Sequence, residues 1–189
     1  TPPIFICFAF ALAVPHAWAI IGGREAKPHS RPYMAYLKYK NEIGIERICG
    51  AFLVRENFLL TALKKAKMNK AVGLLALPRK KDRVRPGKTC SVAGWGSNLE
   101  KKFSTLQEVK LTVRKARECM DKYPKHYNNS TQLCAGDPKD QKASFKGDSG
   151  GPLVCDRVAQ GIVSYGFRDG RNPRVYTQIS SFYHGSRKQ

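Results

Sequence analysis

The sequence predicts an all-β fold, and three observations support that prediction. Short runs rich in β-branched, aromatic and leucine residues recur along the chain after residue 20, and Gly, Pro and Asn separate them. Of the 189 residues, 42% are hydrophobic, which is enough for the core of one ordinary domain. Helical patterns are rare and short. Many short strands separated by loop signals predict a barrel or a sandwich.

The expected strands follow one another along the chain. They are 33–40, 49–54, 57–62, 89–96, 106–113, 152–155, 159–166 and 174–179. A short helix is expected at 115–122. A second, C-terminal helix is expected after Ile179, capped by Ser180 or Ser181, although Gly185 weakens it.

Residues 1–19 have the character of a signal peptide. "IFICFAFALAV" forms an apolar core, and "AWA" before Ile20 has the small-x-small form of a cleavage site. A buried hydrophobic strand is the alternative interpretation. No apolar run reaches the roughly 18 residues of a membrane span. We predict a secreted chain whose mature domain is 20–189.

The cysteines and one polar loop agree with secretion, which permits disulfides. Without Cys7 in the signal, five cysteines remain, so one is unpaired or pairs with another chain. The segment "NNST" contains overlapping glycosylation sequons that begin at Asn128 and Asn129, as suits a surface loop.

The chain is strongly basic, with 34 Lys and Arg, 14 Asp and Glu, and a net charge of +20. Ten basic residues lie between Lys64 and Lys88, with Asp82 as the only acid among them. Such a surface attracts polyanions by long-range steering and counterion release. In a secreted protein we favour a sulfated, heparin-like proteoglycan over nucleic acid or membrane; the alternative is a solvated surface with no dedicated partner.

One motif carries chemistry. In "GDSGGP" at 147–152, Ser149 lies among three glycines, which allow a tight backbone path with amides aimed beside the hydroxyl. A nucleophile next to convergent N–H donors is what acyl transfer requires.

With this motif in view, the chain resembles the chymotrypsin-fold serine proteases, and in particular their granzyme, mast-cell protease and duodenase branch. The matching segments, in order, are "IIGGREAKPHSRPYMAYL", "CSVAGWG", "TLQEVKLTV", "LCAGDP", "SFKGDSGGPLVC" and "VAQGIVSYG". They cover the chain after Ala19 except at one gap. The resemblance implies a trypsin-like double six-stranded β-barrel with a short C-terminal helix, and secretion into granules of lymphocytes or mast cells.

The resemblance also implies roles for residues of the nucleophile loop. Ser149 would be the nucleophile, with the amides of Gly147 and Ser149 as the oxyanion hole. Asp148 would receive the α-amino group of Ile20, the ion pair that orders this family's active site. Because "AWA" directly precedes Ile20, signal peptidase itself would expose that group.

A specificity pocket is implied in the same way. Ala143 would form its floor and Arg174 would project into it, as in granzymes that cleave after aspartate. Ser164, Tyr165 and Gly166 would form the strand edge that pairs with substrate. A guanidinium binds a carboxylate through charge-assisted, often bidentate bonds, so the expected residue before the scissile bond is Asp or Glu. The alternative has Arg174 turned out to solvent.

The resemblance breaks between Ala62 and Leu63. The family continues "LTA" with the "AHC" of its catalytic histidine and later carries its catalytic aspartate, whereas here "LTA" runs into "LKKAKMNK". A block is therefore inferred to be absent, which truncates the first barrel. The chain's histidines are expected in the signal or on the surface, not as a base: His16, His29, His126 and His184.

The resemblance implies two disulfides and one unpaired cysteine. Cys90 would join Cys155 and Cys119 would join Cys134, while Cys49 would lose its partner with the missing block. No cofactor or metal is expected.

Three hypotheses follow. The first is a granzyme-like, Asp-directed endopeptidase by descent, which is inactive in this chain because an internal block is absent. The second is a secreted, cationic, monomeric pseudoprotease that binds heparin-like glycans. The third is a product that folds poorly because unpaired strand edges are exposed.

Overall fold

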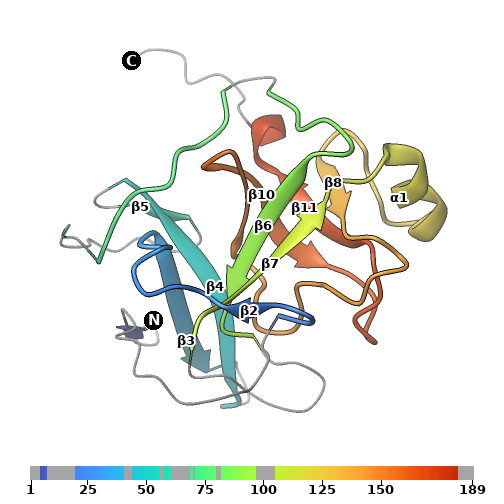
Figure 1. Cartoon of the computed structure of the whole chain (residues 1–189). Helices are drawn as coiled ribbons and strands as arrows, with labels where there is room; N and C mark the ends of the chain where they lie inside the picture. Colours follow the sequence, from blue (N-terminus) through green and yellow to red (C-terminus); the bar gives the residue numbers. More distant parts are fainter. Residues whose placement is uncertain are drawn as a thin grey trace.

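The part of the chain that the structure describes forms two antiparallel sheets and one short α-helix (Figure 1). The computed structural model describes residues 5–7, 20–40, 44–55, 58–60, 69, 71–79, 82–96 and 105–182. The first sheet has the order β1-β3-β4-β5, with bounds Phe5–Cys7, Met34–Lys40, Glu46–Arg55 and Phe58–Leu60. The second has the order β2-β7-β6-β9-β10-β11-β8, with bounds Arg24–Glu25, Gln107–Thr112, Thr89–Gly94, Pro152–Cys155, Val158–Tyr165, Arg174–Gln178 and Gln132–Ala135.

The all-β prediction is confirmed. All the expected strands are present, and the expected helix is α1, Ala116–Lys122. Strand β4 begins earlier than expected because Glu46, Arg47 and Ile48 continue the ladder with β3. Strand β8 was not predicted, because its four residues follow a polar loop and carry no alternating pattern.

Both ends of the chain are described only in part. Of the predicted signal peptide, only β1 is described, and it pairs with β3 in antiparallel register. Where a C-terminal helix was expected, Ile179–Phe182 form a 3-10 turn, and the rest of that helix, residues 183–189, lies outside the described ranges. No helix in the described part is long and apolar enough to cross a bilayer.

In the second sheet, the first and last of six consecutive strands are bridged to each other. Their order is β7-β6-β9-β10-β11-β8, and a bridge between Val113 and Ala135 joins the two end strands. The Arg114 N–H donates to the Cys134 carbonyl and the Gly136 N–H to the Thr112 carbonyl, each at 2.9 Å. These bonds pair the ends of the run, as a closed barrel requires.

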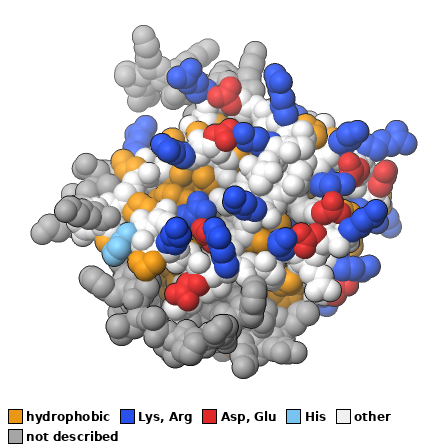
Figure 2. Space-filling model, in the orientation of Figure 1, with side chains coloured by type: hydrophobic (Ala, Val, Ile, Leu, Met, Phe, Trp, Pro, Cys, Tyr) orange, Lys and Arg blue, Asp and Glu red, His pale blue; other side chains and the backbone are white. Residues whose placement is uncertain are grey.

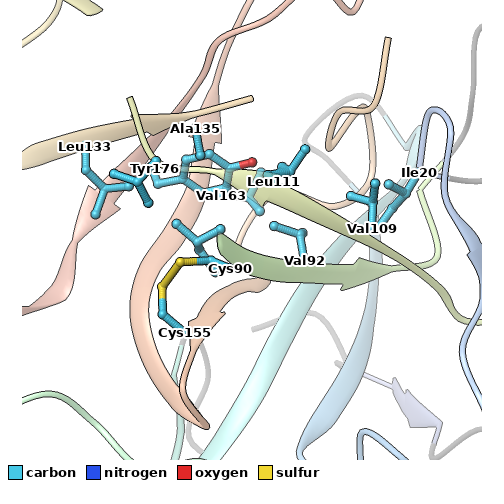
Figure 3. Close-up of a cluster of buried hydrophobic side chains, with 12 residues drawn as sticks. Ile20, Cys90, Val92, Val109, Leu111, Leu133, Ala135, Cys155, Val163 and Tyr176 are labelled. Carbon is cyan, nitrogen blue, oxygen red and sulfur yellow. A yellow bond between two sulfur atoms is a disulfide. The ribbon is translucent and has the colours of Figure 1, made fainter. Parts of the chain in front are cut away.

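A buried cluster fills the interior of this run (Figure 3). Its members come from all six strands, and Ile20 joins them from the N-terminal segment. The Cys90–Cys155 disulfide ties β6 to β9 at the edge of the cluster. A separate buried cluster of Ala35, Leu37, Ala51, Leu53 and Val72 lies on the first sheet, so each sheet has a core of its own.

The two sheets meet at β4. The Gly50 N–H donates to the Ser149 carbonyl at 2.9 Å, and a Cβ on Gly50 would lie 3.0 Å from backbone atoms of Gly151. Glycine is thus the residue that lets β4 lie directly against the loop before β9. Nearby, the Tyr36 ring on β3 meets the Trp95 ring edge-on at 5.8 Å.

Candidate active site

The nucleophile loop, residues 144–151, runs from the segment after β8 into β9. Gly147 and Gly150 have φ values of 94° and 87°, which favour glycine. A Cβ on Gly147 would lie 2.8 Å from the Cα of Gly96, so a side chain would also collide there. Ser149 and Gly147 are half-buried. The Gly150 N–H donates to the Val163 carbonyl at 3.0 Å, which holds the loop against β10.

Asp148 is buried completely inside this loop. Its carboxylate accepts the Gly96 N–H at 2.9 Å and the Phe145 N–H at 2.8 Å. Burial raises the pKa of Asp148 to about 6, although these two donors and the charge of Arg174 act in the opposite direction. No ion pair to this carboxylate is formed within the described ranges. The site therefore holds a buried acid without a bound cation.

Ile20 lies in the core, with no exposed surface. Ile21 and Ala143 exchange two backbone hydrogen bonds of 3.0 Å, and the Gly23 N–H donates to the Ile20 carbonyl at 3.0 Å. These bonds fix the Ile20 segment beside the strand-like stretch that leads into the nucleophile loop. The two members of the expected ion pair are therefore both buried and are carried by adjoining segments.

Arg174, the first residue of β11, is 7% exposed, so it is not turned out to solvent. One guanidinium nitrogen donates to the Phe167 carbonyl at 2.6 Å, and the group lies 5.7 Å from the Phe145 ring centre. The group also lies so close to Gly166 that a Cβ there would strike it. Ala143 is fully buried.

The charge of Arg174 is poorly compensated. Burial lowers its pKa from the ordinary value, and Tyr176, Tyr123 and Asp148 offset part of that effect. Its Nε is buried without a hydrogen-bond partner. Among the described residues no carboxylate forms an ion pair with it. A buried guanidinium with a free donor has the chemistry to accept an incoming carboxylate.

Aromatic side chains that the sequence analysis did not single out lie around Arg174. The Ser144 and Tyr176 hydroxyls are 3.0 Å apart, and burial raises the pKa of Tyr176. Phe167 stacks on Tyr123 at 4.8 Å. Phe145 stands inside the "SFKGDSGG" motif, which was the one available signal for it.

The expected substrate-binding edge lies at the end of β10. Pairing of β10 with β9 stops at Ile162, so Ser164, Tyr165 and Gly166 continue past their neighbour on that side. Ser164 is exposed, and Tyr165 donates its hydroxyl to the His126 carbonyl and to Gln132 Oε1, each at 3.1 Å. The backbone here has a free side at which another strand can pair.

No general base accompanies Ser149 in the described structure. Of the histidines, His29 and His126 are exposed, while His16 and His184 lie outside the described ranges. The Ala62–Leu63 junction lies outside them as well. The described residues also hold no cluster of His, Cys, Asp or Glu suited to a metal ion.

The cysteines pair as the resemblance implied. The structure forms Cys90–Cys155 and Cys119–Cys134, and Cys49 is a half-buried free thiol.

Asn128 and Asn129 are exposed before β8, as sites of glycosylation must be. The Asn128 side-chain oxygen accepts the Ser130 N–H at 2.8 Å. Arg83 donates to the Asn129 and Ser130 carbonyls, which holds the loop in place.

Comparison with known proteins gives a consistent result. The protein-family model described as Trypsin matches residues 20–64 and 63–184. Granzyme B of Homo sapiens is 43% identical over 242 aligned positions, which cover 98% of this chain and 97% of that protein. Mast cell protease 3 of Ovis aries is 45% identical over 221 positions, covering 88% and 87%. A solved structure described as "Structure of GrC" matches with a TM-score of 0.80 and 39% identity, covering 86% of this chain and 96% of that one.

Two details of these matches concern the junction. The two segments matched by the family model meet at residues 63–64. The alignment with human granzyme B has 242 positions, more than the 189 residues of this chain, so it contains positions of the relative that have no counterpart here.

Proposed function

Because this chain belongs to the trypsin family of chymotrypsin-fold serine proteases, we propose that its site is that of a granzyme-like endopeptidase directed at aspartate, and that the chain itself does not hydrolyse peptides. The observation that supports the proposal is the combination of a glycine-rich nucleophile loop with a buried guanidinium, that of Arg174. Among the described residues, no histidine is buried beside Ser149 to act as its base. The substrate class is protein or peptide.

The aspartate preference rests on Arg174. Its guanidinium is buried between the Phe145 ring and the Gly166 backbone, with no carboxylate partner in the described structure. A substrate carboxylate that reached it would gain charge-assisted hydrogen bonds in a region of low dielectric constant. An apolar or cationic side chain would leave the guanidinium uncompensated.

The lack of activity rests on the chemistry of an unassisted hydroxyl. A serine without a base is a weak nucleophile at neutral pH. In serine proteases, loss of the catalytic histidine lowers kcat about a millionfold, and roughly a thousandfold acceleration over water survives from the oxyanion hole and binding. We attribute the missing base to a block lost between Ala62 and Leu63, which the meeting of the two family matches at 63–64 supports.

The N-terminal processing step belongs to the same proposal. Removal of residues 1–19 would place the charged amine of Ile20 next to the segment that holds buried Asp148. A positive charge there would stabilise the ionised carboxylate, which burial disfavours. Secretion and storage in granules of lymphocytes or mast cells follow from the same lineage, as relatives named granzyme and mast cell protease suggest.

The test compares two proteins on peptide libraries that vary the residue before the scissile bond. The first is the chain that begins at Ile20; we expect no turnover above that of a Ser149→Ala control. The second carries the block of human granzyme B grafted between Ala62 and Leu63; we expect cleavage after Asp. Turnover by the first protein that Ser149→Ala abolishes would refute the claim of inactivity.

The grafted protein also tests the pocket. Arg174→Gln should lower kcat/KM for the Asp substrate by at least about a hundredfold, because a buried charge pair is lost. Arg171→Gln is the matched control: Arg171 also lies near Phe167, but its side chain is 71% exposed. Cleavage after Phe or Lys instead of Asp would overturn the assignment of the pocket.

A second function is favoured by charge. The net charge of +20 and the spread of Lys and Arg over the surface (Figure 2) suit a secreted pseudoprotease that binds sulfated glycans. Tight, salt-sensitive retention on heparin is the expected result, and elution near physiological salt would exclude this function.

A further inference from the structure

Two concave regions adjoin on the face of the molecule shown in Figure 2, over β2, β6 and β7. Their volumes are about 580 Å³ and about 390 Å³. Both are lined by Arg31, Ser91 and Lys110, so the two regions adjoin along these residues and are described together as one groove. No residue of the nucleophile loop lines it. We call it the β6–β7 groove.

The groove is cationic along its length. Its basic residues are Arg24, Arg31, Lys110, Lys142 and Arg157, and its acids are Glu108 and Asp156. Most of the acidic charge is already paired. Arg31 donates two hydrogen bonds to Glu108, at 2.9 and 3.1 Å, and Arg24 binds the other oxygen at 3.2 Å. Asp156 pairs with Lys88 at 2.6 Å.

The centre of the groove is rigid. The Arg31 side chain is only 20% exposed, because it is held by Glu108 and by the Tyr33 hydroxyl at 2.9 Å. These bonds raise the pKa of Arg31 against the effect of burial, and the guanidinium stays charged. A cation fixed in place loses less side-chain entropy on binding than a mobile surface lysine.

Two further cations that line the groove with Arg31 are exposed: Lys110 and Arg157. The side chain of Lys110 makes no hydrogen bond or ion pair within the described structure, and the same holds for the side chain of Arg157. Arg157 occupies the two-residue turn between β9 and β10, with φ of 65°, so the hairpin fixes where its side chain begins. The hydroxyl groups of Ser91 and Thr89 also line the groove.

We propose that the β6–β7 groove is a binding site for a sulfated oligosaccharide. Cations held along a concave path match sulfates spaced along a chain, and hydroxyl groups between them suit the sugar oxygens. The groove would be the specific site on a chain whose overall charge attracts the glycan. The proposal rests on the glycan-binding function given above, and it is independent of the protease site.

The test measures binding of a size-defined heparin octasaccharide to the full chain by calorimetry at several salt concentrations. Lys110→Gln with Arg157→Asn removes the two unpaired cations, and asparagine accepts the positive φ of the turn. Arg79→Gln with Arg85→Gln is the matched control: it removes two exposed charges from the basic segment between Lys64 and Lys88. Thermal unfolding checks that both variants remain folded.

We expect the groove variant to bind at least about tenfold more weakly, with a salt dependence shallower by about two ionic contacts. The control should lose less than about threefold. Equal losses in both variants would overturn the groove, because they indicate a diffuse field with no site. Retained binding in the groove variant with loss in the control would place the site in the basic segment instead.

The remaining outcomes are also decisive. If the unmodified chain fails to retain the octasaccharide at physiological salt, the glycan-binding function itself fails, whatever the variants do. If a single-stranded DNA of equal charge competes as well as heparin, the groove does not recognise a sulfated sugar.

Discussion

At the scale of single residues, burial shifts the pKa values of Asp148 and Arg174 in the direction that disfavours their charged forms. Each carries a charge inside the protein without an ion-pair partner in the described structure. The family resemblance singled out both residues in the sequence. Sequence analysis could not predict their burial or hydrogen bonds, because these depend on Gly96, Phe145 and Phe167, which are distant in sequence from one or both.

The raised pKa of Asp148 predicts a dependence of stability on pH. The unfolded carboxyl titrates near 3.8 and the folded one at about 6, so the folded state holds the proton more tightly between these values. The free energy of unfolding should therefore fall by about 3 kcal/mol as the pH rises from 4 to 7, since each pKa unit corresponds to about 1.4 kcal/mol.

This change is measured as the difference between the full chain and Asp148→Asn in urea unfolding, which cancels other titrating groups. Ser149→Ala serves as the control, because it alters the same loop without removing a titrating group. A difference that stays constant from pH 4 to pH 7 would contradict the raised pKa.

At the scale of elements, α1 depends on its tertiary contacts. The helix has seven residues, and the side chain of its N-cap residue, Lys115, makes no capping hydrogen bond. A helix of this length is too short to be stable in isolation. Cys119 on this helix is joined to Cys134 on β8, and the ring of Tyr123 at its end stacks on Phe167. The sequence placed this helix correctly but not β8, because a four-residue strand is defined by its ladder with β11 rather than by its own pattern.

Removal of this disulfide should loosen the helix. The bond closes a separation of 15 residues, and such a link is worth about 3 kcal/mol. Cys119→Ala with Cys134→Ala should therefore lower the free energy of unfolding by about that amount, and the amide protons of α1 should exchange faster. Cys49→Ser removes a cysteine but no bond, so it should change stability by less than about 0.5 kcal/mol. Equal effects in the two variants would show that the disulfide contributes nothing.

At the scale of the whole molecule, the two sheets are unequal. The second completes a run of six strands joined at its ends, whereas the described first sheet has four strands and no such joint. The family resemblance predicts a truncated first barrel, and this stays a prediction because the junction at Ala62 and Leu63 lies outside the described residues. The local sequence pattern predicted most of the strands, but it could not predict that β7 and β8 pair at the ends of the run. The bridge between Val113 and Ala135 joins segments that a helix and a loop separate in the sequence.

The junction itself has a direct test. Trypsin should release "ENFLLTALK", residues 56–64, only if Ala62 is joined to Leu63. Mass spectrometry of granule proteins from the source tissue should detect this peptide if the chain is made as written. A peptide that continues "ENFLLTA" into histidine and cysteine would show instead that an intact protease is made, and Ser149 would then have its base.

The bond from the Gly50 N–H to the Ser149 carbonyl makes the two sheets thermodynamically linked. Linkage is reciprocal: the free energy by which one event alters the other is the same in both directions. A ligand that the nucleophile loop binds better while this bond is intact would therefore favour the paired form of β4, and fraying of β4 would weaken the binding of that ligand by the same factor. The first sheet, although it supplies no side chain to the described site, is coupled to it through this bond.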